Sequence, residues 1–233
     1  MLSPKILHGE HPGTVEHRAS LGDDVYEALL SRIISLKIQP RERMSVDALA
    51  RDLGVSQTPI RAALIRLETE GLVVKKHNSG FSAAPMPSGE TFRQIYELRQ
   101  LLEPAATAST ARRGGPELLR ELEELHHTMQ EVVREHPVDG YGKFAMLDAR
   151  FHALIADASG NPFIASSLDR LYTHLHLFRL RYHSTVTEDA LIEHEAILEA
   201  LRAGDADAAH AAMARHIETS RQRMEPYFET LED

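Results

Sequence analysis

The sequence has no cysteine and no tryptophan among its 233 residues. The missing cysteine excludes disulfide bonds, thiolate metal sites and cysteine nucleophiles, and it is typical of a protein from a reducing compartment. No apolar run approaches the ~18 residues of a membrane span, and the opening MLSPKILHGEHPG lacks the apolar core of a signal peptide. We therefore expect a cytoplasmic protein with no membrane partner.

Positive charge is also scarce, because 26 Lys and Arg face 35 Asp and Glu. The deficit is uneven: residues 1–85 hold 11 basic and 10 acidic side chains, whereas the remainder holds 15 and 25. Only charge near the phosphates steers a protein to nucleic acid. An acidic second half therefore does not exclude a DNA-binding first half.

The most informative stretch in the first half reads VSQTPIRAALIRLETEGLV. Ile60, Leu64 and Leu67 recur at the spacing of one helix face. We expect the Ser56 hydroxyl to cap the first turn of this helix, and Gly71 to end it in a left-handed conformation. Such a helix, with polar side chains on its outer face, is what the major groove of DNA admits.

The residues around this helix predict a small domain. Periodic apolar residues predict a helix over 21–36 and a shorter one over 46–53, the second capped by Ser45, with a connection over 37–43. The segments 72–74 and 81–83 predict two short strands, and HNSG supplies the turn between them. Three helices followed by a hairpin indicate a winged helix-turn-helix.

The second half is helical throughout, so the fold class is mainly α. We expect an all-α bundle of about six to seven helices, since the breaks between the periodic segments are short. The expected helices lie near 88–113, 116–136, 140–158, 162–183, 187–203 and 205–229. The expected organisation is a flexible tail over 1–20, the winged helix-turn-helix over 21–85, a linker over 86–90 and the bundle over 91–230.

Four side chains in the bundle are candidate metal ligands. Asp148 and His152 are four residues apart and share one helix face, while His194 and His216 lie within later apolar helical patterns. Converging in a bundle, they would suit a divalent metal such as zinc, nickel or manganese. The alternative is that these are ordinary core or surface histidines, because the chain has 14 and convergence cannot be read from periodicity. Glu195 is a candidate to orient one ligand.

Arg99, in YELRQLLEPAA, lies beside an apolar stripe and allows two interpretations. It can be ion-paired with Glu97 or Glu103, or its planar fork can receive a carboxylate ligand through two hydrogen bonds. Lesser candidates for lining the same cavity are Tyr96, Arg150, Asn161 and Arg179.

With both halves in view, the chain resembles the GntR family of bacterial transcription regulators, in its FadR-type branch with the helical ligand-sensing domain called FCD. The resemblance runs from about Leu21 to Phe228. It rests on VSQTPIRAALIRLETEGLV in the first half and on YELRQLLEPAA, DARFHALIADASGNP, EHEAILEALRAGDADAA and MARHI in the second.

This resemblance implies more than the spacing does. It implies that Asp148, His152, His194 and His216 bind a metal, commonly zinc, and that Arg99 contacts a small carboxylate effector beside it. It also implies a homodimer that reads a palindromic operator in double-stranded DNA and is not an enzyme. The alternatives are a metal-sensing regulator and, less favoured, a metal-dependent hydrolase.

The DNA-binding segment departs from the family pattern at two positions. Gln57 stands where an Arg is common, and Asp47 stands where the preceding helix usually carries a basic residue. Both changes predict lost phosphate or guanine contacts, so the operator is expected to be particular to this protein. The candidate DNA-binding residues are Arg43, Gln57, Thr58, Arg61, Arg66, His77 and Gly80.

Overall fold

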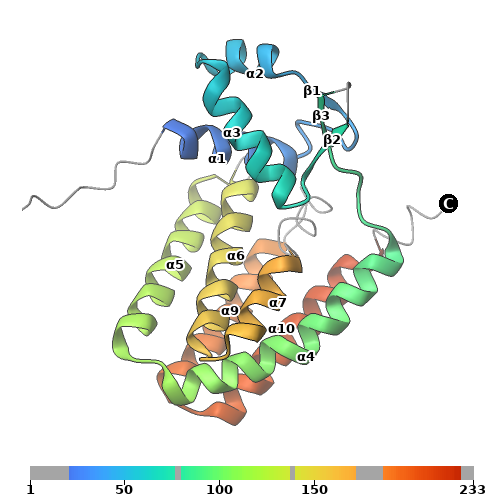
Figure 1. Cartoon of the computed structure of the whole chain (residues 1–233). Helices are drawn as coiled ribbons and strands as arrows, with labels where there is room; N and C mark the ends of the chain where they lie inside the picture. The colour runs from blue at the N-terminus through green and yellow to red at the C-terminus, as the bar shows by residue number, and fades with distance from the viewer. Residues whose placement is uncertain (1–20, 77–79, 137–139, 172–185, 227–233) are drawn as a thin grey trace, which may run out of the picture.

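A computed structural model describes residues 21–76, 80–136, 140–171 and 186–226. A small domain with a three-stranded sheet lies at one end of a helical bundle (Figure 1). The fold class expected from the sequence is confirmed, whereas the domain boundaries stay a prediction. Among the described helices, none is long and apolar enough to cross a membrane.

The small domain is a winged helix-turn-helix. Its helices are α1 (Leu21–Ile34), α2 (Val46–Leu53) and α3 (Gln57–Thr69). Its strands are β1 (Arg43–Met44), β2 (Val73–Lys76) and β3 (Gly80–Ala83), and the antiparallel sheet has the order β1-β3-β2.

Strand β1 corrects the expected connection over 37–43, because Arg43 pairs with Ser82 and Met44 with Phe81. Two residues show too little periodicity to predict a strand, and the pairing joins segments almost forty residues apart.

The caps of α2 and α3 differ. Ser45 Oγ accepts a hydrogen bond from the Ala48 N–H at 3.4 Å, as expected. The expected cap by Ser56 is wrong, since its side chain makes no cap hydrogen bond although its backbone is extended. Ser56 is exposed, so water can satisfy the amides of the first turn. Gly71 does end the segment in the left-handed region, with φ 75°.

The bundle begins at an N-cap, where Ser88 Oγ accepts from the Thr91 N–H. Helix α10 packs along α4 and α9, while α5 lies against α6 and α9. The observed helices agree closely with the expected ones, except that residues 172–185 and 227–229 lie outside the described residues. The helices are α4 (Gly89–Arg113), α5 (Pro116–Glu135), α6 (Tyr141–Ala158), α7 (Pro162–Leu171), α9 (Val186–Arg202) and α10 (Ala206–Met224).

The two parts meet where α1 crosses the start of α6. Tyr141 and Ala145 of α6 are buried in the same apolar cluster as Leu29 and Leu30 of α1. At Gly142 the approach is so close that an added Cβ would lie 3.1 Å from the Ser31 Cα. The small domain therefore rests directly on the bundle through α1.

Candidate functional site

Three buried histidines from three helices converge inside the bundle. His152 lies on α6, His194 on α9 and His216 on α10, and one ring nitrogen of each lies within 4.8 Å of the other two. The sequence could place each one on an apolar helix face, but only the packing of the helices brings them together.

Two of these rings are oriented by carboxylates. His152 Nδ1 lies 2.5 Å from Glu103 Oε2, and His216 Nδ1 lies 2.8 Å from Glu193 Oε2. A neutral ring that donates from Nδ1 has a lone pair at Nε2. The two Nε2 atoms lie 3.2 Å apart, so two electron-rich atoms face one another. That arrangement suits a cation bound between them.

His194 completes the set. It is fully buried, and within the described part of the chain neither of its ring nitrogens has a hydrogen-bond partner. Burial and then the neighbouring His216 lower its pKa well below the ordinary value, so the ring is neutral and able to donate a lone pair. Its Nε2 is 3.4 Å from Asp148 Oδ1. A buried polar group without a partner is costly, and a metal ion would satisfy it.

Glu193 is one of the two orienting residues that sequence reasoning missed, the other being Glu103. Glu193 accepts hydrogen bonds from Thr219 and Arg223 as well as its bond with His216. Burial alone would raise its pKa, but these bonds lower it to about 2, so the carboxylate stays charged.

The sequence offers Glu195 as a candidate orienting residue, although its place next to His194 in the helix points it elsewhere. It lies instead 3.5 Å from His126 Nδ1. The only sequence signal for Glu193 is its place beside His194, and adjacent helix residues point in different directions. Glu193 in fact reaches His216, a candidate ligand on another helix.

Arg99 is buried and paired. Its Nε donates to Glu103 Oε1 at 2.6 Å, and its guanidinium lies 5.2 Å from the Tyr96 ring centroid. Burial opposes the charge, but Glu103 raises the pKa of Arg99 above its usual range. The structure therefore contains the ion pair with Glu103, and through it Arg99 is linked to His152. Contact with an effector stays a prediction.

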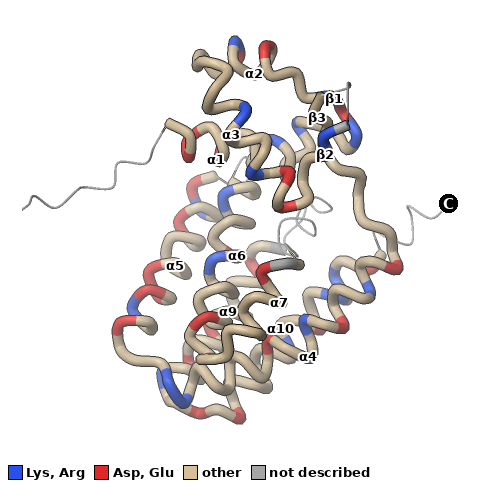
Figure 2. The backbone as a smooth tube through the Cα atoms, in the orientation of Figure 1, with Lys and Arg blue, Asp and Glu red and all other residues tan. Residues whose placement is uncertain are grey.

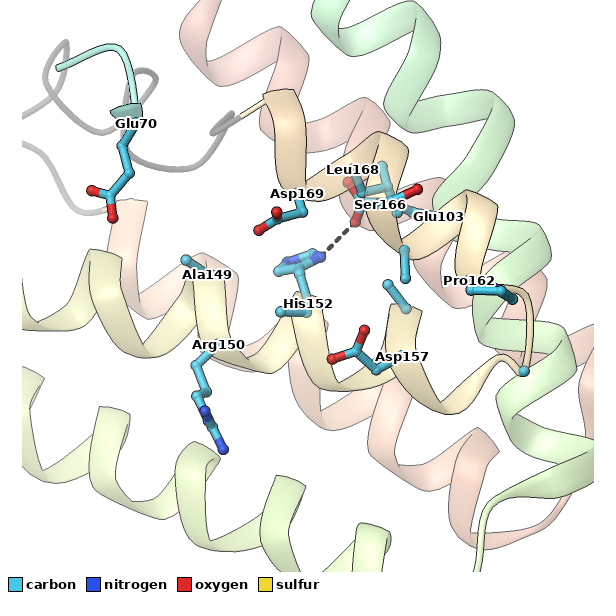
Figure 3. A pocket seen from close by; sticks show the side chains of 14 residues that line it. Glu70, Glu103, Ala149, Arg150, His152, Asp157, Pro162, Ser166, Leu168 and Asp169 are labelled. Carbon is cyan, nitrogen blue, oxygen red and sulfur yellow. Dashed lines mark hydrogen bonds and ion pairs between the residues drawn. The ribbon is translucent and has the colours of Figure 1, made fainter. Parts of the chain in front are cut away.

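A cavity of about 770 Å³ borders this network. Figure 3 shows His152 and Glu103 on its wall, joined by their hydrogen bond, with Asp157 and Asp169 nearby. Glu70, at the end of α3, also lines it, so the DNA-binding domain contributes to a cavity beside the candidate metal centre. The lining residues are Glu70, Glu103, Ala149, Arg150, His152, Ala153, Ala156, Asp157, Gly160, Pro162, Ala165, Ser166, Leu168 and Asp169.

The lesser candidates have other contacts. The Tyr96 hydroxyl lies 2.8 Å from Ser220 Oγ. Asn161 Oδ1 accepts from the Phe163 N–H at 3.1 Å and so caps α7. Arg150 lines the cavity and also donates to Glu121. Arg179 lies outside the described residues, as does His77 of the wing.

The outer surface of the winged helix-turn-helix presents most of the candidate DNA contacts. Gln57, Thr58 and Arg61 are exposed on the first turns of α3, and Arg43 and Gly80 are exposed at the sheet. Figure 2 shows Lys and Arg on α2, α3 and the small sheet, whereas acidic residues gather along α5. These positions suit contact with DNA.

Arg66 is also exposed, but its guanidinium is paired within its own domain. Its guanidinium lies 3.6 Å from the Tyr26 ring centroid, and its Nε donates to Glu70 Oε1 at 3.2 Å. Glu70 also accepts from the Tyr26 hydroxyl at 2.7 Å. A DNA contact by Arg66 stays a prediction.

A winged helix-turn-helix joined to a helical domain with a buried histidine cluster and an adjoining cavity defines a DNA-binding regulator with a sensing domain. The comparisons with known proteins agree. Residues 21–82 match the model of the bacterial regulatory proteins of the gntR family, and residues 94–219 match the FCD domain. The chain belongs to the GntR family of transcriptional regulators that carry an FCD domain.

The relatives are regulators of transcription rather than enzymes. The chain is 29% identical over 215 residues to the regulator LutR of Bacillus subtilis, which covers 83% of this chain and 96% of LutR. It is 28% identical over 217 residues to the Uxu operon transcriptional regulator of Escherichia coli, covering 82% of each.

Solved structures share the fold. E. coli McbR/YncC superimposes with a TM-score of 0.64 at 21% identity, covering 92% of this chain and all of that one. A GntR regulator from Rhodococcus sp. RHA1 superimposes with a TM-score of 0.65 at 20% identity, covering 87% and 96%.

Proposed function

We propose that this regulator binds a palindromic operator as a homodimer and responds to a small carboxylate, an organic or sugar acid, bound beside a divalent metal in the FCD domain. The observation that carries the proposal is the pair of opposed His152 and His216 Nε2 atoms next to His194, whose ring nitrogens have no hydrogen-bond partner among the described residues. Asp148 and the three histidines would hold the metal, zinc being the favoured ion.

In the proposed complex, Arg61 contacts base edges in the major groove, with Gln57 beside it on the first turn of α3. Thr58 and Arg43 hold phosphates, and the wing at Gly80 touches the backbone. One recognition helix spans only one half-site, so two copies are needed to read two half-sites about one helical turn apart. Loss of the Arg61 side chain would cost about 1–3 kcal/mol of operator binding.

The carboxylate would occupy the cavity that His152 and Glu103 line. A bound divalent metal would supply positive charge to attract it. The protein residues would orient the metal ligands, because Glu103 and Glu193 hold the Nδ1 side of the His152 and His216 rings.

Glu70 would couple the cavity to the DNA. It is the C-terminal cap of α3 and is held by Tyr26 and Arg66, so a ligand that contacts it acts on the end of the recognition helix. If the effector favours an arrangement that mis-spaces the two recognition helices, it weakens DNA binding by the same factor by which DNA weakens effector binding.

A metal-sensing regulator is the second candidate. Four carboxylates line the cavity (Glu70, Glu103, Asp157 and Asp169), whereas Arg150 is the only Arg or Lys among its described lining residues. Such a wall is less suited to an anion unless the bound metal offsets it. In this alternative the metal is itself the signal.

A thermal-shift screen separates these functions. Purified protein, once loaded with zinc and once treated with chelator, is melted with a panel of organic and sugar acids. The proposed function requires at least one acid to raise the melting temperature of the zinc-loaded protein only, because a ligand that binds the folded state stabilises it. Stabilisation by zinc alone, with no acid adding to it, favours the metal sensor.

A further inference from the structure

The two positions that depart from the family pattern are hydrogen-bonded to each other. Gln57 Nε2, at the start of α3, donates to Asp47 Oδ1 on α2. Arg61, one turn further along α3, donates from Nη2 to Gln57 Oε1 at 3.1 Å. Three exposed side chains thus form a chain of hydrogen bonds across the outer surface of the helix-turn-helix.

Only one orientation of the Gln57 amide satisfies both of these hydrogen bonds. An ionised carboxylate only accepts, so the Gln57 amide must turn its NH2 group toward Asp47. Its carbonyl oxygen then faces Arg61, whose guanidinium only donates. The reversed amide would place donor against donor and acceptor against acceptor. Asp47 therefore decides which way Gln57 points, and Gln57 decides what it offers Arg61.

Arg61 is the side chain that gains from this arrangement. Its long stem has many rotamers in solution, and ordering it costs free energy when it binds. A guanidinium has five N–H groups, of which Gln57 accepts a hydrogen bond from one. The others remain for a base, and bidentate recognition of guanine needs the fork at a defined angle.

We propose that Asp47 and Gln57 are positioning residues that preorganise Arg61 to read one base pair, and that Asp47 determines sequence specificity without touching DNA. This inference rests on the proposed base contact of Arg61. Asp47 then replaces the direct DNA contact of a basic residue with an indirect effect on Arg61. The base pair that Arg61 reads depends on a carboxylate in another helix.

The positioning role of Asp47 can be told apart from a simple effect of its charge, because the two change different properties of DNA binding. A carboxylate close to the phosphates repels them, so its removal raises affinity for every DNA sequence. If Asp47 also orients Gln57, its removal lowers the discrimination between sequences at the same time. Asp52 offers a matched control, since it lies on the same helix and pairs with Arg32 instead.

The test uses the full-length protein loaded with zinc and a randomised DNA library. The wild type and Arg61→Ala are selected in parallel, and the position at which their motifs differ is the one that Arg61 reads. Anisotropy then measures binding of the selected duplex and of its three single-base variants at that position. The variants are Asp47→Ala, Asp47→Asn, Gln57→Ala, Asp52→Ala and the double variant Asp47→Ala/Gln57→Ala.

We expect Asp47→Ala and Gln57→Ala each to reduce discrimination about 2- to 10-fold, the effect of leaving one long side chain unordered. The double variant should be no worse than either, because the two residues act through one path. Asp47→Asn keeps an acceptor oxygen and should retain most of the discrimination. Asp52→Ala should change affinity uniformly.

Two results overturn the inference and are distinguishable. If Asp47→Ala behaves as Asp52→Ala does, with uniform affinity change and unaltered discrimination, the positioning role is wrong while the Arg61 contact stands. If Arg61→Ala selects the same motif as the wild type, the base contact itself is wrong.

Discussion

His152 and His216 point their Nε2 atoms at each other across 3.2 Å, and each ring is held from behind by a carboxylate on a different helix. The two histidines and their two carboxylates come from four helices, α4, α6, α9 and α10. When both rings donate from Nδ1, their Nε2 lone pairs repel each other at this distance, and a cation bound between them would replace that repulsion with attraction. Metal binding and the stability of the sensing domain should therefore be linked.

Replacing His216 with Ala should abolish this link. We expect the metal content of purified protein, measured by mass spectrometry, to fall from about one ion per chain to almost none. Chelator should lower the melting temperature of the wild type, because a metal present at 100 times its dissociation constant stabilises the folded protein by about 2.7 kcal/mol. It should leave the melting temperature of the variant unchanged, because the variant binds no metal. His210→Ala, an exposed histidine on the same helix, should behave as wild type.

Glu193→Gln should weaken metal binding without removing a ligand. An amide can no longer hold the Nδ1 proton of His216 as a carboxylate does, and loss of such an orienting group typically costs about 10- to 100-fold in metal affinity. Competition with a chromophoric chelator measures the change. Glu195→Gln is the control, because Glu195 lies beside His126. Equal effects of the two substitutions would contradict the orienting role.

Glu70→Gln should reduce communication between the cavity and the DNA. We expect the ratio of operator affinities with and without the acid found in the thermal-shift screen, both measured in zinc, to move toward one, while operator binding without the acid changes little. Anisotropy on a selected operator measures both affinities. Glu68→Gln, two residues earlier on the same helix, should leave the ratio intact. An unaltered ratio in Glu70→Gln would rule out this path.

Gly142→Val should destabilise the contact between the two parts of the chain. Even a Cβ there would lie 2.8 Å from Ser31 Oγ and 3.1 Å from Ser31 Cα, and the second atom belongs to the backbone of α1. Overpacking of this kind costs about 1–3 kcal/mol. Urea unfolding followed by circular dichroism measures the loss. Lys143→Val places the same side chain on the exposed neighbouring position and should be nearly neutral.

Local patterns were enough to predict most of the helices. The periodicity of α3, the cap at Ser45 and the left-handed Gly71 are set by neighbours in sequence, and each was predicted correctly. Strand β1 was not, because its two residues are held by pairing with a distant strand. The Ser56 cap failed because a suitable residue at the right position does not determine where its hydroxyl points.

In the candidate site, too, the features set by nearby residues could be predicted and those set by distant contacts could not. The four candidate ligands could be named because Asp148 and His152 share a helix face and the whole chain resembles a family. The groups that orient them could not. Glu103 reaches His152 and Glu193 reaches His216 across helix crossings that no spacing encodes. The same is true of Glu70, which enters the cavity only because the small domain rests on α6.

The central claim is that a metal-centred site in the bundle controls DNA affinity. Its most direct test is operator binding by the full-length protein in chelator, in zinc, and in zinc with each acid of the panel, for the wild type and His216→Ala. The account requires one of these additions to change wild-type affinity by about 5- to 150-fold, the usual range of allosteric coupling, with no change in the variant. Wild-type affinity that is the same under all conditions, or a response that survives in His216→Ala, would contradict it.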